Sequence, residues 1–166
     1  QSKFHIADIV LDQDSVLRRN ANVERERAVA IHDLLTDNYF EPVGSDGGPY
    51  HLHLGIVENR LTFAIYLEAE HLKEACLQDG QAHGRIALSL TPFRRVVREY
   101  FAICESYYSA IVEAPHARIE ALDMGRRGLH NEGAELLTER LKGKADLDFE
   151  TARRLFTLIS VLHLKL

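Results

Sequence analysis

The sequence predicts an α+β fold: a small antiparallel sheet with an N-terminal helix, followed by a C-terminal bundle of three longer helices. Two observations carry this prediction. In residues 50–67 apolar side chains alternate with polar ones, as on a half-buried strand. From residue 91 onward apolar residues recur every three or four positions, the spacing of a helix. Strands followed by helices are typical of the α+β class.

The N-terminal part is expected to contain one strand and one helix. Phe4 to Leu11 can form the strand. A helix is expected at residues 23–37, with Asn22 as its N-cap and Glu24 and Glu26 in the first turn, where the helix dipole favours acidic side chains. Its apolar residues at helical spacing are Val23, Ala28, Ile31, Leu34 and Leu35.

The middle of the chain is expected to supply the rest of the sheet. Alternating apolar residues on both sides of a turn at residues 58–60 predict a hairpin. The other expected elements are a short strand at 40–43, a loop at 45–49, a short helix at 70–77, a loop at 78–84 and the last strand at 86–90.

Everything from Thr91 onward is expected to be helical. Thr91 as N-cap with Pro92 as the first helical residue is a helix start. Pro115 is expected to open the next helix, and Asp148 to cap the final one. Residues 155–164 of that final helix are apolar on nearly every side, so the helix should be central in the fold or shared with a second subunit.

The second of these helices carries the most unusual stretch, residues 124–133. Gly125, Gly128 and Gly133 fall inside a helical pattern, where each glycine costs about 1 kcal/mol relative to alanine. They therefore suggest a close backbone approach, a kink or a bound anion. One seam of this helix places two arginines and a glycine where leucine is expected: Ile119, Leu122, Arg126, Leu129, Gly133, Leu136 and Arg140.

Composition is consistent with a single domain over residues 1–166, made of a mixed part (1–91) and a helical part (92–166). The net charge of −5 is uneven, because residues 1–91 carry 8 Lys and Arg against 14 Asp and Glu, whereas residues 92–166 carry 12 against 11. Cys76 and Cys104 make no disulfide framework and indicate the cytosol. No membrane span or signal peptide is expected.

Arg126 and His130 form the leading candidate site. They lie four residues apart on one helical face and can together hold a phosphate or carboxylate. The further candidate ligand-binding residues are Arg127, Arg153, Arg154 and Arg94. The alternative is internal ion pairing: Asp123 with Arg127, Glu132 with an arginine of a neighbouring helix, and Arg153 or Arg154 with Glu105, Asp123 or Glu132.

An enzyme would use His130 or Glu132 as its acid or base. On a regular helix, residues two apart point about 200° away from each other, so the two can share a pocket only if the helix breaks. This geometry favours a binding protein over an enzyme. Tyr100, Tyr107 and Tyr108 can supply hydroxyl groups, although tyrosines at this spacing are more often core residues.

No cofactor and no metal site is predicted. His51 and His53 share a strand face, but a third ligand such as His5, His71 or His83 cannot be placed from sequence. The acidic total charge argues against nucleic acid as a partner.

Several stretches together make the chain similar to UPF0262, an uncharacterised family of small bacterial cytosolic proteins. They are residues 26–31, 40–43, 90–95, 104–108, 124–133 and 151–156. The resemblance implies a bacterial cytosolic protein and carries over no activity. The segment from Glu68 to Gly84 is longer than is usual in the family.

Three hypotheses follow for the function. The favoured one is a non-catalytic cytosolic binding or regulatory protein, a homodimer in one version, that recognises an anionic ligand or a partner protein through its helical half. The second is an enzyme acting on a phosphorylated or carboxylated small molecule, with an arginine clamp and His130 or Glu132 as proton carrier. The third is a structural adaptor whose last helix forms the interface.

Overall fold

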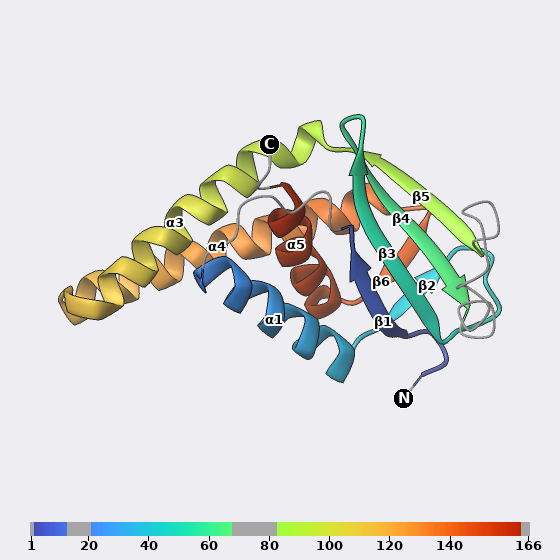
Figure 1. The fold of residues 1–166 in the computed structure, drawn as a ribbon, viewed down its shortest axis with the longest axis horizontal. Coiled ribbons are helices and arrows are strands. Elements are labelled where there is room, and N and C mark those ends of the chain that lie inside the picture. The colour runs from blue at the N-terminus through green and yellow to red at the C-terminus, as the bar shows by residue number, and fades with distance from the viewer. Residues whose placement is uncertain (1, 13–20, 68–82, 164–166) are drawn as a thin grey trace.

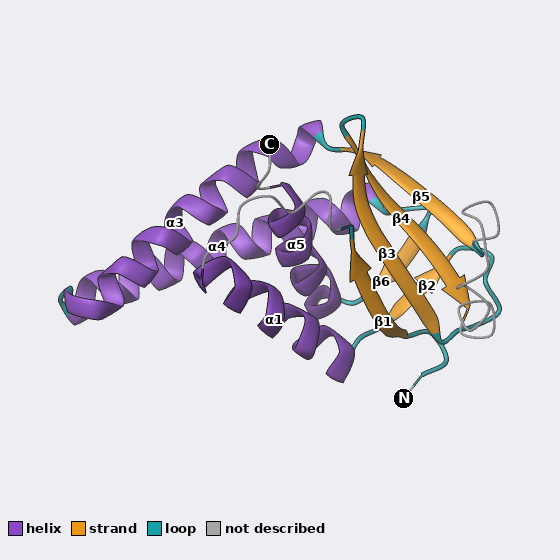
Figure 2. Cartoon of the chain, viewed as in Figure 1, coloured by secondary structure: helices purple, strands orange, loops and turns teal. Residues whose placement is uncertain are grey.

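The computed structural model describes residues 2–12, 21–67 and 83–163, and its elements confirm the α+β class. Strands gather at one end and helices at the other (Figure 2). In chain order the elements are β1 (Ile6–Leu11), α1 (Ala21–Thr36), β2 (Phe40–Pro42), β3 (Tyr50–Val57), β4 (Arg60–Leu67), β5 (Gly84–Ser89), a 3-10 turn (Thr91–Phe93), α3 (Arg94–Glu113), α4 (His116–Arg140), β6 (Ala145–Leu147) and α5 (Phe149–His163).

The main sheet has the strand order β1-β3-β4-β5. Strands β3, β4 and β5 are antiparallel, as predicted, and Glu58 and Asn59 make the β3–β4 turn with positive φ angles of 51° and 63°. Strand β1 is a correction, because it pairs parallel with β3 and makes the sheet mixed. A parallel neighbour requires a long crossover, and α1 with β2 supplies it.

A second, two-stranded sheet joins β2 to β6 in antiparallel pairing. The expectations that the chain is wholly helical after Thr91 and that 86–90 holds the last strand were therefore wrong. Three residues are too few to show a period-2 pattern, so β6 left no signal in the sequence. Its pairing fixes the segment between α4 and α5 against the strand at Phe40–Pro42.

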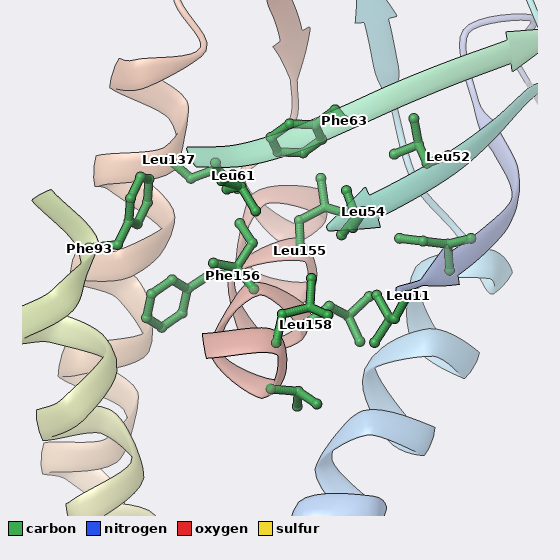
Figure 3. Close-up of a cluster of buried hydrophobic side chains, with 14 of the residues drawn as sticks. Leu11, Leu52, Leu54, Leu61, Phe63, Phe93, Leu137, Leu155, Phe156 and Leu158 are labelled. Atoms are coloured by element: carbon green, nitrogen blue, oxygen red, sulfur yellow. The ribbon is translucent and has the colours of Figure 1, made fainter. Parts of the chain in front are cut away.

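Helix α5 lies centrally, in contact with α1, α4 and β3 (Figure 1). Every residue from Leu155 to His163 is buried. Figure 3 shows Leu155, Phe156 and Leu158 pointing into a cluster with side chains of the sheet and of the neighbouring helices. Of the two placements predicted for this apolar helix, the central one is therefore observed within a single chain.

Helices α3 and α4 pack as a long antiparallel pair whose far ends project away from the sheet (Figure 1). Helix α4 is unbroken through its glycines. A Cβ added at Gly133 would lie 2.4 Å from the ring of Phe156, so this glycine allows α4 and α5 to cross closely. Gly128 has open space around it. The predicted seam is wrong at its end, since Arg140 is exposed and Leu137 is buried in its place.

The side chain of Asn38 links α1 to β1. Its Oδ1 accepts a hydrogen bond from the Ile6 amide at 2.7 Å, and its Nδ2 donates to the carbonyls of Ile6 at 3.0 Å and Leu34 at 2.8 Å. Asn38 is only 5% exposed, so these bonds satisfy a buried amide. They set the position of α1, which forms one wall of the site described below.

The helix ends differ in part from the predictions. Asp148 caps α5 as predicted, with its Oδ1 accepting from the Thr151 amide at 2.9 Å. Asn22 lies inside α1 and does not cap it. Thr91 lies in the 3-10 turn, which spaces α3 from β5, and its side chain makes no cap.

Some predictions lie outside the described residues. They are the helix at 70–77, most of the loop at 78–84, His71 and Cys76.

Candidate functional site

Helices α1, α3, α4 and α5 surround a cavity of about 210 Å³. Three carboxylates and three guanidinium groups line it, together with a histidine, a tyrosine and a threonine. Its lining residues are Glu26, Val29, Ala30, Asp33, Tyr100, Arg126, His130, Glu150, Arg153, Arg154 and Thr157. Four of the residues singled out in the sequence, Arg126, His130, Arg153 and Arg154, are thus brought together.

Glu26 on α1 accepts hydrogen bonds from three side chains of α3. Tyr100 Oη lies 3.0 Å and Cys104 Sγ 3.8 Å from Glu26 Oε1, and Tyr108 Oη lies 3.1 Å from Oε2. The donors are spaced four residues apart, so they share one face of α3. Burial, reinforced by the Glu26 charge, raises the pKa of Cys104 and of Tyr108 to about 12. Both groups therefore keep their protons and donate at neutral pH.

His130 on α4 is bound on both ring nitrogens by Arg153 of α5. Its Nε2 lies 2.8 Å from the Arg153 carbonyl oxygen, which can only accept, and its Nδ1 lies 3.2 Å from Arg153 Nη2, which can only donate. Only the neutral tautomer with hydrogen on Nε2 satisfies both contacts. Thr157 Oγ1 is a further neighbour, 2.9 Å from Nε2.

The protonation state of His130 follows from this setting. Burial lowers its pKa to about 4, and the positive charges of Arg153 and Arg126 act in the same direction, while the hydrogen bond to the Arg153 carbonyl opposes them. His130 is therefore neutral at pH 7. Because neither ring nitrogen is free, the ring serves to hold Arg153 in place and is a poor general base.

Each arginine of the pocket is only partly paired. Arg126 Nη2 lies 2.8 Å from Asp123 Oδ1, and its guanidinium lies 4.7 Å from the centre of the Tyr107 ring. Arg153 Nη1 lies 3.3 Å from Glu150 Oε2. The Nε atoms of Arg126 and Arg153 are buried and have no hydrogen-bond partner in the described part of the chain.

The third arginine of the pocket, Arg154, shares the same acidic partner. Its Nη2 lies 3.8 Å from Glu150 Oε1, and its Nη1 donates to the Asp37 carbonyl at 3.1 Å. The side chains of Arg153 and Arg154 are each 26% exposed. The acidic partners proposed for them from sequence were wrong, because Glu150 of the same helix takes that role.

Three other candidate residues lie away from this cavity. Arg94 donates to Asn59 in the β3–β4 turn. Arg127 is 68% exposed and pairs with Asp123 at 2.8 Å, as the ion-pair alternative predicted. Glu132 pairs with an arginine of the neighbouring helix, which is Arg95 of α3. Glu132 and His130 therefore face different partners, in line with the geometry of an unbroken helix.

Sequence reasoning missed the three carboxylates of the pocket. Glu26 was interpreted only as a first-turn acid, and Asp33 and Glu150 were not singled out. The signal for Glu26 was present, because it falls between the buried residues Val23 and Ala30 at the spacing of one helical face. A carboxylate in an apolar stripe requires donors nearby, but sequence does not say that α3 supplies them.

His51 and His53 both lie on β3, as predicted. His51 Nδ1 is 3.9 Å from Asp8 Oδ2 of β1, and the His53 ring centre is 4.8 Å from that of Tyr66 on β4. Of the other candidate ligands, His83 contacts Ser45 at 3.3 Å. Across residues 2–12, 21–67 and 83–163, no group of three or more His, Cys, Asp or Glu side chains is arranged to hold a metal ion.

Comparison with known proteins identifies the family. The profile described as "Uncharacterised protein family (UPF0262)" matches residues 3–165. The chain belongs to this family. It is 53% identical over 160 residues to a UPF0262 protein of Agrobacterium fabrum, covering 96% of this chain and 95% of that protein. A UPF0262 protein of Rhizobium johnstonii is 52% identical over 163 residues, with 98% and 97% covered.

A third UPF0262 protein, from Nitrobacter winogradskyi, is 53% identical over 164 residues, which cover 99% of this chain and 92% of that protein. These relatives are bacterial, and their names state no activity. No solved structure gives a significant match. In the part of this UPF0262 chain that the structure describes, no helix is both long and apolar enough to cross a membrane.

Proposed function

We propose that this UPF0262 protein is a non-catalytic binding protein that takes up a small anionic molecule, with a phosphate or carboxylate group, in the cavity between α1, α3, α4 and α5. One observation carries the proposal. Arg126 and Arg153 approach the cavity from two helices, and each has a buried Nε–H without a partner in the described part of the chain.

Buried hydrogen-bond donors are rarely left unsatisfied in folded proteins, and leaving one unmade costs about 1–3 kcal/mol. Asp123 and Glu150 each bind an Nη group of their arginine, His130 contacts the other Nη of Arg153, and no described group binds either Nε–H. The planar guanidinium meets a carboxylate or phosphate with two parallel hydrogen bonds, so an anion in the cavity can satisfy both arginines together.

The pocket supports binding better than catalysis. His130 is neutral with both nitrogens engaged, and Glu132 pairs with Arg95 of α3, away from the cavity. Glu26 already accepts three hydrogen bonds. A general base for the enzyme hypothesis would have to come from Asp33, the remaining carboxylate of the lining that makes no ion pair in the described chain.

Thermal unfolding with added ligand tests the proposal. The probes are inorganic phosphate, succinate and glycerol phosphate, applied to the wild type, Arg126→Ala and the matched control Arg127→Ala. The two variants remove the same charge from adjacent residues that share Asp123, but only Arg126 lines the cavity. At 100 times its Kd, a ligand stabilises the native state by about 2.7 kcal/mol, equivalent to a Tm increase of about 5–10 °C for this chain length.

The expected result is a saturable Tm increase in the wild type and in Arg127→Ala, and its loss in Arg126→Ala. The absence of a shift with every probe would contradict the proposal and leave the structural adaptor. An equal loss in both variants would place the binding on the outer surface of α4. Turnover of a bound probe that disappears in His130→Ala would favour the enzyme instead.

The remaining parts of the proposal concern the cell and the partners. We propose a cytosolic location, and recognition of a partner protein through the helical half is the alternative to the anionic ligand. The homodimer remains a prediction. The apolar face of α5 that suggested it is buried within one chain, so this face does not support a dimer. Light scattering of the purified protein measures the subunit number directly.

A further inference from the structure

The walls of the cavity between α1, α3, α4 and α5 carry opposite charges. The α1 wall contributes Glu26 and Asp33, and the α4 and α5 walls contribute three arginines together with Glu150, which pairs with two of them. Building on the proposed function, we infer that the ligand is a small zwitterion, in which a carboxylate or phosphate group is joined to an ammonium group. The anionic group meets the arginines, and the ammonium group meets α1.

Within the described residues, the acidic wall formed by Glu26 and Asp33 of α1 makes no ion pair. Glu26 and Asp33 are seven residues apart, so they lie on one face of α1, about 10 Å from each other along its axis. The partners of Glu26 are the neutral donors of α3. In the described chain, no Lys, Arg or His side chain lies within ion-pair distance of either carboxylate.

On the opposite wall, each ion pair of the arginines lies within a single helix. Arg126 binds Asp123 on α4, and Arg153 and Arg154 bind Glu150 on α5. The charges of α1 and those of α4 and α5 thus face each other across the cavity and do not close into contact. This arrangement leaves hydrogen-bonding capacity on both sides of the same space.

The charges on the two walls indicate which kind of ligand fits the cavity. An anion without a positive group would bring its charge close to Glu26 and Asp33, and a cation alone would meet three arginines. Both arrangements bring like charges together. A zwitterion meets an opposite charge on each side. The cavity of about 210 Å³ is below the range of roughly 300–1,000 Å³ typical of drug-sized ligands, so a molecule the size of an amino acid is expected.

Calorimetric titration with matched probe pairs tests the inference. Phosphoethanolamine is compared with ethyl phosphate, and β-alanine with propionate; the members of each pair differ by the ammonium group. Phosphoethanolamine or β-alanine is expected to bind the wild type at least tenfold more tightly than its matched anion. Asp33→Asn should bring that ratio close to one without weakening the matched anion. The control Asp37→Asn removes an acid just beyond α1 that does not line the cavity, and it should keep the ratio.

The outcomes separate the two proposals. If both members of each pair bind with equal affinity in the wild type, the zwitterion is wrong and the anion-binding function stands. If no probe binds, both are contradicted. If the ratio of the two affinities is unchanged in Asp33→Asn, the acidic wall does not bind the ammonium group. Where the unliganded Asp33→Asn protein unfolds early, Glu26→Gln replaces it, with the same loss of ratio expected.

Discussion

Arg153 binds both ring nitrogens of His130: its backbone carbonyl contacts Nε2, and its guanidinium contacts Nδ1. The contact joins α5 to α4 at the wall of the cavity. It fixes the histidine as a neutral ring and, in return, fixes the direction of an arginine whose Nε–H is still unpartnered in the described chain. His130 is therefore a positioning residue for Arg153 in this account.

The lowered pKa of His130 predicts a pH dependence of stability. Its pKa falls from 6.5 to about 4 on folding, so the unfolded chain binds more protons between these values. The contribution is fully present above pH 6.5 and is lost as the pH falls toward 4, with a slope of at most about 1.4 kcal/mol per pH unit. Urea unfolding at pH 7, 6, 5 and 4 measures it.

The matched variant for this prediction is His130→Gln, whose amide can still donate to the Arg153 carbonyl but does not titrate. Subtracting its profile from that of the wild type removes the contributions of the other titrating groups, including His163, whose pKa is also lowered by burial. Parallel profiles for the two proteins would show that His130 is charged or solvated in the native state.

The hydrogen bonds to Glu26 predict a difference between two adjacent tyrosines. Tyr108→Phe removes a hydroxyl that donates to Glu26, and a bond to a charged group contributes about 1.5–3 kcal/mol. Tyr107→Phe keeps the ring that contacts Arg126, and its cost should be below about 0.5 kcal/mol. Denaturant midpoints give both values. Equal losses would mean that Glu26 does not depend on the α3 hydroxyls.

The glycines of α4 predict substitutions of opposite sign. Gly133→Ala places a Cβ 2.4 Å from the Phe156 ring and should destabilise the protein by about 1–3 kcal/mol through overpacking. Gly128→Ala meets no neighbour within 4 Å and should stabilise it by about 0.5–1 kcal/mol through helix propensity. A stabilising Gly133→Ala would show that α4 and α5 cross less closely than described.

Elements with several residues in a clear period could be predicted from sequence. The β3–β4 hairpin, the helices α3, α4 and α5 and the cap at Asp148 were confirmed because alternation, 3.6-residue spacing and a short polar side chain each act locally. The parallel direction of β1 and the pairing of β6 depend on segments more than 35 residues away in the chain, and no local pattern encodes them.

The candidate site was predictable to a similar extent. Arg126 and His130 were paired correctly on one face, since spacing along a single helix decides that. Glu150 lies three residues before Arg153, a spacing that could have identified this acidic partner. The approach of Glu26 to α3 follows from tertiary packing alone, so the acidic half of the pocket emerged only with the fold.

The most direct test of anion binding is to observe the arginine Nε–H groups themselves. In 15N–1H NMR spectra, the Nε–H signals are assigned by single Arg→Lys variants and followed during titration with inorganic phosphate and phosphoethanolamine. If the arginines bind the anion, the Arg126 and Arg153 signals shift saturably with one shared Kd, and the Arg127 signal changes little. Small, unsaturated shifts that are equal at Arg126 and Arg127 would contradict anion binding.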